Sequence, residues 1–312
     1  MIMIRLWLLK TGIESNPGPY FCNEKITVSN VNINSITAES RLQELEQFVT
    51  YNNIGILGLV ETKLDSSINP CLYKLPAFHT PFTRHRDRKG GGVALYVHSS
   101  LAITRLNNLE CGEIEWIWAK IKVKDKLIIV CCTYIPPNTD ANWKNIFLEH
   151  LADSVNLAKT YNPSNILIFG DFNAGNNYLI DPSVNHTPVT AFEKLFKSET
   201  DSLELSQLIV QPTRMHENVQ NIRDLIFVSN DELVLDSGVT SPFSNIDHCP
   251  VYATINLTLT PSFETRKTIW DYHRTDVNQL TNILTTTDWR TIIDNDIDTA
   301  ANIFTQTLLE AA

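Results

Sequence analysis

The stretch Ile166-Leu167-Ile168-Phe169-Gly170-Asp171-Phe172-Asn173 decides the fold class and gives the first indication of function. Four apolar residues that end at a glycine are typical of a short buried strand. Asp171 and Asn173 follow, and side chains two residues apart in extended chain point to the same side. Active groups of α/β proteins lie just past strand ends, where an acid and an amide can orient water and hydrogen-bond a phosphate. An Asx turn is the alternative explanation of the same string.

Outward from this stretch, apolar runs rich in β-branched residues alternate with amphipathic segments from about residue 25 to 257. Helical spacing of apolar residues predicts helices over 42–49 and 143–158, and two weaker ones over 276–286 and 295–310. Strands are predicted over 26–31, 54–60, 93–97, 116–123, 127–134, 166–169, 224–228 and 251–257. Strands outnumber helices and mix hairpins with helical crossovers. We therefore predict an α/β fold, a two-sheet α/β sandwich with a helical C-terminal extension, rather than a simple doubly wound sheet.

Other chemically active side chains also stand at predicted strand ends. Glu61 directly follows the strand 54–60, and a hard cation such as Mg²⁺ needs only one or two protein carboxylates beside water and substrate oxygens. Asp247 and His248 precede the last strand, where a histidine can donate to a developing anion or act as acid or base. Each residue has an ordinary alternative: a solvated glutamate, or a histidine that caps a turn.

Three further residues share this placement with weaker signals. Asn32 ends the first predicted strand, and Tyr134 ends the strand 127–134, where packing would explain it equally well. Asp224 begins a late strand, and it could pair with the neighbouring Arg223 instead of serving a site.

Composition sets limits on the class of protein. The chain of 312 residues carries a formal net charge of −10, which argues against nucleic-acid binding by bulk positive charge but not against a metal-dependent nuclease. The basic cluster 84–89 suits either a solvated hairpin turn or a phosphate-contacting loop. Six scattered cysteines support neither a zinc site nor a disulfide framework, which indicates an intracellular protein. The apolar start 1–9 is too short to span a membrane and lacks a signal-cleavage site.

Taken in chain order, these strings resemble the endonuclease/exonuclease/phosphatase superfamily, which includes deoxyribonuclease I and the apurinic/apyrimidinic endonucleases. The resemblance spans residues 26–257 and departs at Ile246, where the family often has serine before Asp-His. The matching strings are Asn32-Ile33-Asn34-Ser35-Ile36, Glu61-Thr62, Tyr134-Ile135-Pro136-Pro137, Gly170-Asp171-Phe172-Asn173, Arg223-Asp224-Leu225-Ile226 and Asp247-His248.

The resemblance implies a metal site for Mg²⁺ or Mn²⁺ and no small-molecule cofactor. Glu61 is expected to bind the divalent metal, with Asn32 and Asp247 nearby as ligands or supporting groups.

It also implies a catalytic set. Asp171 is expected to orient or deprotonate the attacking water, and Asn173 and Tyr134 to hydrogen-bond the scissile phosphate. His248, held by Asp224, is expected to stabilise the pentacovalent transition state. Phosphodiester hydrolysis needs these functions: an aligned nucleophile, charge neutralisation and help for the leaving oxygen.

Three strings narrow the resemblance to the endonuclease domains of LINE-type retrotransposons: Gly91-Gly92-Val93-Ala94-Leu95-Tyr96, Gln211-Pro212-Thr213-Arg214 and Arg266-Lys267-Thr268-Ile269-Trp270-Asp271-Tyr272. This branch implies an enzyme that nicks double-stranded DNA in the nucleus, contacts no membrane, and leaves a 3′ hydroxyl that primes reverse transcription. The third string is similar to the connector that precedes reverse transcriptase, and no Tyr-x-Asp-Asp polymerase signature is found.

Three segments are expected: a leader over 1–20, the nuclease domain over 21–258, and a connector toward a reverse transcriptase over 259–312. The string Ile13-Glu14-Ser15-Asn16-Pro17-Gly18-Pro19 resembles a 2A-type ribosome-skipping peptide, with Gly12 in place of its usual aspartate.

Two alternatives from other classes stay open at this point. The same fold could hydrolyse a phospholipid or an inositol phosphate, or the chain could be a decayed element copy that only binds DNA.

Overall fold

The computed structural model describes residues 24–37, 40–123, 126–178, 186–216, 219–242, 246–257, 277–290 and 296–311 of the chain. Residues 1–261 and 262–312 form separate compact units. The second unit contains α5 (Val277–Thr286) and α7 (Ile297–Ala311), where helices were predicted, and Trp289 packs against Phe304 at 5.6 Å between ring centroids. Within the described residues, every helix is too short or too polar to cross a membrane.

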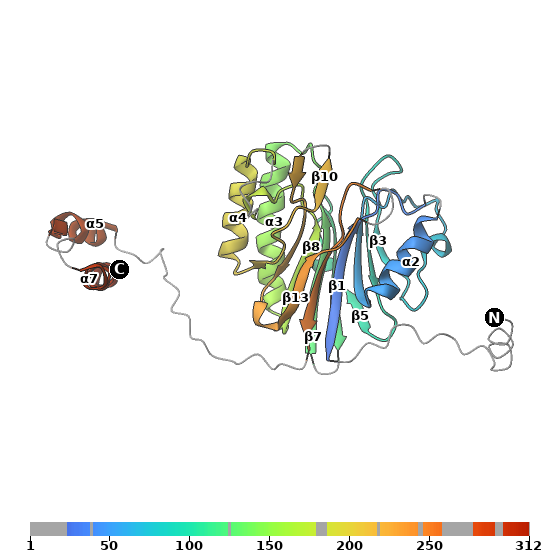
Figure 1. Ribbon diagram of the computed structural model, residues 1–312, viewed down its shortest axis with the longest axis horizontal. Coiled ribbons are helices and arrows are strands. Elements are labelled where there is room, and N and C mark those ends of the chain that lie inside the picture. Colours follow the sequence, from blue (N-terminus) through green and yellow to red (C-terminus); the bar gives the residue numbers. More distant parts are fainter. Residues whose placement is uncertain are drawn as a thin grey trace. The chain divides into compact units, whose positions relative to one another are not determined.

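Strands of the described part of the first unit form two six-stranded mixed sheets and a separate hairpin (Figure 1). The first sheet has the order β13 (Val234–Val239), β14 (Val251–Asn256), β1 (Lys25–Asn32), β2 (Ile54–Val60), β4 (Val93–Val97), β3 (Phe82–Arg84). The second has the order β5 (Ala102–Arg105), β6 (Glu115–Val123), β7 (Lys126–Tyr134), β8 (Asn165–Asp171), β12 (Asp224–Val228), β9 (Ser206–Gln207). The hairpin pairs β10 (Arg214–His216) with β11 (Val219–Asn221).

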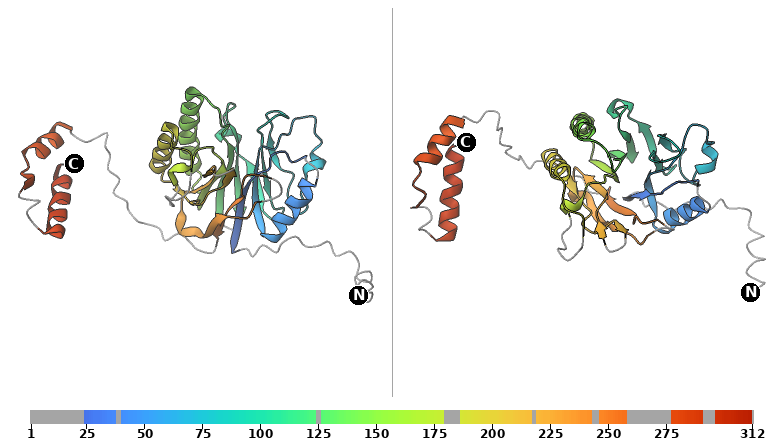
Figure 2. Two further views of the ribbon diagram at one scale, coloured as in Figure 1. Left: turned by 45° about the horizontal axis from the view of Figure 1, so that its top comes forward. Right: turned by 90° about the horizontal axis from the view of Figure 1, so that it is seen from above.

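Helices cover the two outer faces of the paired sheets, as Figure 2 shows from above. The helix α2 (Arg41–Tyr51) lies on the flank of the first sheet, and α3 (Ala141–Lys159) and α4 (Ala191–Ser202) lie on the flank of the second. Asp140 caps α3 by accepting a hydrogen bond from the Trp143 amide at 2.8 Å. The predicted two-sheet α/β sandwich with a helical C-terminal extension is confirmed.

The core lies between the facing sheets. A Cβ atom added to Gly58 of β2 would stand 2.6 Å from the Phe169 ring and 2.8 Å from the Cys132 sulfur, so the two sheets are in close contact at this glycine. Cys132 and its neighbour Cys131 are fully buried, and burial raises the pKa of both thiols. No disulfide joins the cysteines in the described ranges, and these two behave as small hydrophobes, as expected.

The predicted strands agree with the observed ones to within two residues at either end. The sequence reasoning missed α4 and β13 together with several short strands. The beginning of α4 carried a readable signal, since Thr190 and Glu193 form a reciprocal capping box. The strand β13 did not, because its sequence Val-Leu-Asp-Ser-Gly-Val has neither strict alternation nor an apolar run.

Strand register brings the predicted polar residues to one end of the sandwich. In the first sheet, β1 runs parallel to β2, so Asn32 stands beside Val60, which precedes Glu61. In the second sheet, β7 runs parallel to β8 and pairs Tyr134 with Asp171, while the antiparallel β12 pairs Asp224 with the same Asp171. The carboxyl ends of four strands and the beginning of a fifth therefore meet at this end.

Candidate active site

An amide side chain joins the two sheets at this end. Asn32, at the end of β1, donates from Nδ2 to Glu61 Oε1 at 3.1 Å and to Asp171 Oδ2 at 3.0 Å. Asp171 is 1% exposed and Asn32 is 4% exposed, so the bond between them lies out of solvent. Two carboxylates from different sheets thus share one amide nitrogen.

The loops that carry these groups have a constrained backbone. Glu61 adopts φ 54 and Asn34 φ 43, in the left-handed region that costs a non-glycine residue about 1–3 kcal/mol. The conformation is held by a hydrogen bond from the Ser35 amide to the Glu61 carbonyl at 2.8 Å, and by Lys63 Nζ on Asn34 Oδ1 at 2.5 Å. Strain of this kind is concentrated at functional sites, since the surrounding structure must fix the side chain that it presents.

Tyr134 and Asn173 complete the group around the carboxylates. The buried Tyr134 hydroxyl donates to Glu61 Oε1 at 3.2 Å, and burial, followed by the charges of Glu61 and Asp171, raises the pKa of the phenol. Asn173 donates from its backbone amide to Asp171 Oδ1 at 3.0 Å and from Nδ2 to the Ile135 carbonyl at 2.8 Å. The bond to Asp171 is an Asx turn, so the turn and the site, weighed as alternatives from the sequence, coexist.

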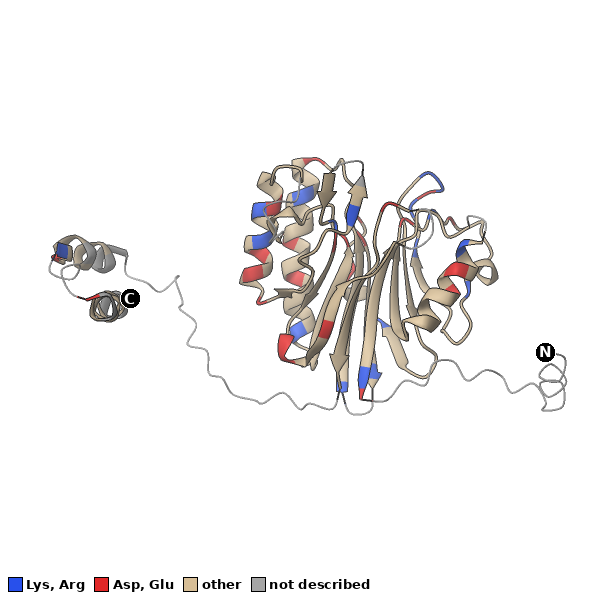
Figure 3. Cartoon of the chain, in the orientation of Figure 1, with Lys and Arg blue, Asp and Glu red and all other residues tan. Residues whose placement is uncertain are grey.

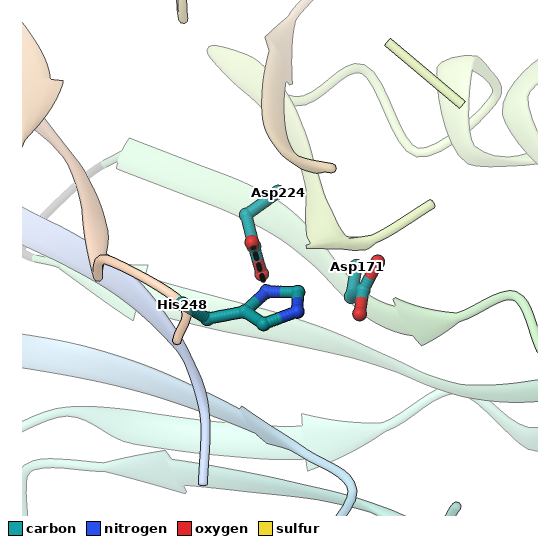
Figure 4. Close-up of side chains that lie close together, drawn as sticks. All are labelled: Asp171, Asp224 and His248. Carbon is teal, nitrogen blue, oxygen red and sulfur yellow. Dashed lines mark hydrogen bonds and ion pairs between the residues drawn. The ribbon is translucent and has the colours of Figure 1, made fainter. Parts of the chain in front are cut away.

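Asp224 and His248 form a buried pair next to this group. His248 Nδ1 lies 2.7 Å from Asp224 Oδ2, and the second ring nitrogen faces Asp171 (Figure 4). Arg223 donates to the Asn173 carbonyl at 2.9 Å and forms no ion pair with Asp224 among the described residues. The alternative pairing of Asp224 with Arg223 is therefore wrong.

Sequence reasoning missed two side chains that hold Asp224 in place. Asn30 donates from Nδ2 to Asp224 Oδ1 at 3.2 Å, and the Thr213 hydroxyl accepts the Asp224 amide at 3.0 Å. Asn30 was within reach, because it precedes Asn32 by two residues and so shares its face of β1. Thr213 was quoted within a string that resembles retrotransposon endonucleases, but nothing in its spacing indicated this contact.

The charges of the buried groups are strongly perturbed. Burial, then the negative charge of Asp224, raises the pKa of Asp171 to about 7, and His248 opposes the rise. Burial lowers the pKa of His248, but the charge and hydrogen bond of Asp224, with the charges of Asp171 and Asp247, outweigh it and raise the value to about 9. At neutral pH His248 is therefore a cation that faces an acid near its midpoint of titration.

Asp247 bonds to Arg214 and not to the predicted metal ligands in the described residues. Its Oδ2 accepts from Arg214 Nε at 2.8 Å, and the carboxylate is 39% exposed. Burial raises the pKa of Asp247, but the hydrogen bond and charge of Arg214 outweigh this and lower it. Across the described residues, no hydrogen bond connects Asp247 with Asn32 or Glu61.

The residues at the site fit a hard divalent cation. Glu61, Asp171 and Asn32 offer oxygen atoms of the type that Mg²⁺ and Mn²⁺ prefer. Within the described ranges, no lysine or arginine forms an ion pair with Glu61 or Asp171, although Asn32 holds the two acids together. A cation bound there would offset this charge.

A different trio, Asp171, Asp224 and His248, places its ligand atoms within 4.8 Å of one another. His248 is a poorer ligand than Glu61, because a protonated imidazole has no free lone pair and its Nδ1 is engaged by Asp224. The trio is better explained as a charged His248–Asp224 pair that faces the carboxyl group of Asp171.

Two facing sheets with acids, amides and a charged histidine gathered at their shared end define a phosphoester hydrolase of the nuclease or phosphatase type. The sequence model of the Endonuclease/Exonuclease/phosphatase family matches residues 30–262, and the chain belongs to this family. The predicted family resemblance is confirmed. No curated protein sequence matches the chain.

Solved structures share the fold at low sequence identity. The endonuclease domain of TRAS1, a telomere-specific non-LTR retrotransposon, is 15% identical, with a TM-score of 0.58 over 75% of this chain and 100% of that one. The AP endonuclease LMAP from Leishmania major is 14% identical, with a TM-score of 0.61 over 75% and 88%. An AP endonuclease from Archaeoglobus fulgidus is 16% identical, with a TM-score of 0.56 over 74% and 99%.

Proposed function

We propose that this chain is a Mg²⁺- or Mn²⁺-dependent endonuclease that nicks double-stranded DNA for the insertion of a LINE-type retrotransposon. The observation that carries the proposal is the hydrogen-bonded chain from the half-buried Glu61 through Asn32 to the buried Asp171, which faces the His248–Asp224 pair. This arrangement supplies a metal site, an acceptor for a proton and a cation within one polar cluster. The structural likeness to the TRAS1 endonuclease domain supports the choice of DNA as the substrate.

The chain's own residues have complementary roles in this reaction. Asp171, held by Asn32 and the Asn173 amide, orients the attacking water and accepts its proton. His248, charged and held by Asp224, donates a hydrogen bond to the phosphate oxygens as negative charge develops on them.

Two further groups bind the substrate. The Tyr134 hydroxyl and the side-chain amide of Asn173 hydrogen-bond the non-bridging oxygens of the scissile phosphate. To do so, the hydroxyl leaves Glu61 and the Asn173 side chain leaves the Ile135 carbonyl. Glu61 and Asn32 would hold the metal ion, and Asp247 would support the site from its ion pair with Arg214. The bound ion would supply charge neutralisation and polarise the phosphate.

The flanking segments are part of the same proposal. Residues 21–258 form the nuclease domain, and residues 259–312 connect it to a reverse transcriptase. The enzyme would act in the nucleus, where chromosomal DNA is its substrate. The 2A-like string 13–19 and the connector string 266–272 lie outside the described residues. A reporter fused behind residues 1–25 and translated in vitro would yield two products if ribosome skipping occurs, and one if it does not.

Plasmid nicking tests the proposed activity. We expect the full chain to convert supercoiled plasmid to the open-circular form with Mg²⁺ and to stop in EDTA. Asp171→Ala and His248→Ala should each abolish nicking, while the control Asp201→Ala, at an exposed acid paired with Lys197, should retain it. Folding of each variant is checked by circular dichroism.

A folded wild-type chain that leaves plasmid intact would refute the proposal. Release of phosphate from soluble inositol phosphates by the same preparation would then favour the lipid or inositol phosphate alternative. Inactivity on both substrates, with DNA binding retained, would favour the decayed copy.

A further inference from the structure

The glycine triplet Gly90-Gly91-Gly92 and the basic residue Arg86 form one built structure beside the site. Arg86 donates from Nε to the Gly90 carbonyl at 3.0 Å and from Nη1 to Glu115 Oε1 at 2.8 Å. The other Glu115 oxygen accepts the Gly92 amide at 2.5 Å. Both oxygens of one carboxylate thus fix an arginine and the loop beneath it.

Glycine is required at this position for a steric reason. Gly91 adopts φ +68, and a Cβ atom there would lie 2.6 Å from Arg86 Nε and 2.6 Å from Glu115 Oε2. The guanidinium therefore lies directly against bare backbone. The triplet leads into β4 and also seats the arginine.

This assembly adjoins the catalytic group. Glu115 of β6 stands directly opposite Tyr134 of β7 in the sheet, and the Arg86 guanidinium lies 5.7 Å from the centre of the Tyr134 ring. The Tyr134 hydroxyl is in turn bonded to Glu61. The stacking on an aromatic face and the ion pair fix the arginine in one orientation.

Arg86 keeps donors available after these contacts. A guanidinium has five N–H groups, and the described contacts engage Nε and one N–H of Nη1. The side chain is 37% exposed, whereas that of Glu115 is 12% exposed. Figure 3 shows basic residues gathered on the loop between β3 and β4 that carries Arg86. In a chain with a net charge of −10, this loop is a local source of the positive charge that DNA requires.

We propose that Arg86, clamped by Glu115 over the glycine triplet, binds a backbone phosphate of the DNA strand that is cut and orients that strand over Tyr134. This rests on the proposed nuclease function and extends it to a specific substrate contact. Of the two interpretations of the basic cluster 84–89, the solvated turn and the phosphate-contacting loop, the proposal selects the second for Arg86.

Binding of the full chain to a fluorescent DNA duplex in EDTA tests the contact without catalysis. Arg86→Gln should weaken binding roughly tenfold, as expected for loss of a hydrogen bond to a charged group, and should lower the salt slope by about one. Arg88→Gln is the control from the same loop, since Arg88 is 68% exposed and lies 3.7 Å from Asp65. It should weaken binding clearly less than Arg86→Gln.

The variant Glu115→Gln separates a built site from diffuse charge. Removing a negative charge near DNA tightens binding if only bulk electrostatics acts, whereas loss of the Arg86 clamp weakens it. Glu113→Gln removes the same charge at an exposed position two residues away and should leave binding equal or tighter. In the double variant, Glu115→Gln should add little to Arg86→Gln.

Equal effects of Arg86→Gln and Arg88→Gln, or tighter binding by a folded Glu115→Gln variant, would overturn the proposal. A wild-type chain that binds DNA with the expected pattern but nicks nothing would leave this contact intact and refute the nuclease function instead. If the wild-type chain nicks plasmid but Arg86→Gln leaves DNA binding unchanged, the nuclease function stands and the Arg86 contact is refuted.

Discussion

Replacing Asp224 by asparagine tests whether the charge of Asp224 keeps His248 protonated at the centre of the site. Asp224 is 1% exposed, accepts from His248 Nδ1 at 2.7 Å and is held by Asn30 and Thr213. Asparagine keeps the same shape and can still accept from His248 through its carbonyl, while its amide nitrogen donates to Asn30 Oδ1 once the Asn30 amide is reversed. The substitution therefore removes the charge and leaves most of the geometry.

The magnitude follows from the pKa of His248. Its rise from 6.5 to about 9 corresponds to about 3 kcal/mol of preferential stabilisation of the charged ring. Because the folded-state value lies above the unfolded one, this stability is fully present below pH 6.5 and is lost as the pH rises through 9. Between pH 7, where Asp171 is already about half ionised, and pH 9.5, the wild type should lose about 2 kcal/mol through His248.

In Asp224→Asn, loss of the largest counter-charge should bring the pKa of His248 well below its wild-type value, although the charges of Asp171 and Asp247 still favour the charged ring, so less of the ring is charged at pH 7. Histidine NMR in the metal-free chain measures the midpoint of the His248 titration in the wild type and in the variant. Urea unfolding at pH 7 and pH 9.5 measures how the stability of each protein changes with pH. Nicking at pH 7 should fall by roughly 10²–10³-fold, as for loss of a charged transition-state donor. A His248 midpoint near 6.5 in the wild type, or unfolding curves of the two proteins that shift equally with pH, would refute the reasoning.

Three other substitutions probe the fold and the site separately. Gly170→Ala should destabilise the chain by about 3 kcal/mol or prevent folding, because a Cβ there meets the Thr133 backbone in β7; stability to urea equal to wild type would contradict this packing. Tyr134→Phe removes the hydroxyl on Glu61 and should reduce nicking about tenfold with little change in melting temperature; unchanged kinetics would remove Tyr134 from the site. Glu61→Gln should weaken Mg²⁺ binding in calorimetry at least about tenfold, whereas Glu113→Gln should not; equal binding by both variants would place the metal elsewhere.

The sequence by itself determined the strand framework and much of the site. Short apolar runs predict buried strands. Glu61, Asp171 and His248 could be chosen as candidate site residues because each flanks such a run. The order of these strings along the chain then indicated the family. These inferences succeed because burial and strand ends are local properties of a segment, which the side chains of that segment control.

Only the tertiary structure decided which side chains meet. Asn32 and Asp171 are separated by 139 residues and bond across two sheets, and Asn30 reaches Asp224 over 194 residues. The same applies to Arg86, a loop residue whose partner Glu115 lies 29 residues away on β6. Such pairings depend on register and on the distance between the sheets, which approach each other closely where Gly58 faces Phe169 and Cys132. No local pattern contains that distance, because it results from the fit of two surfaces that the chain brings together only when it folds.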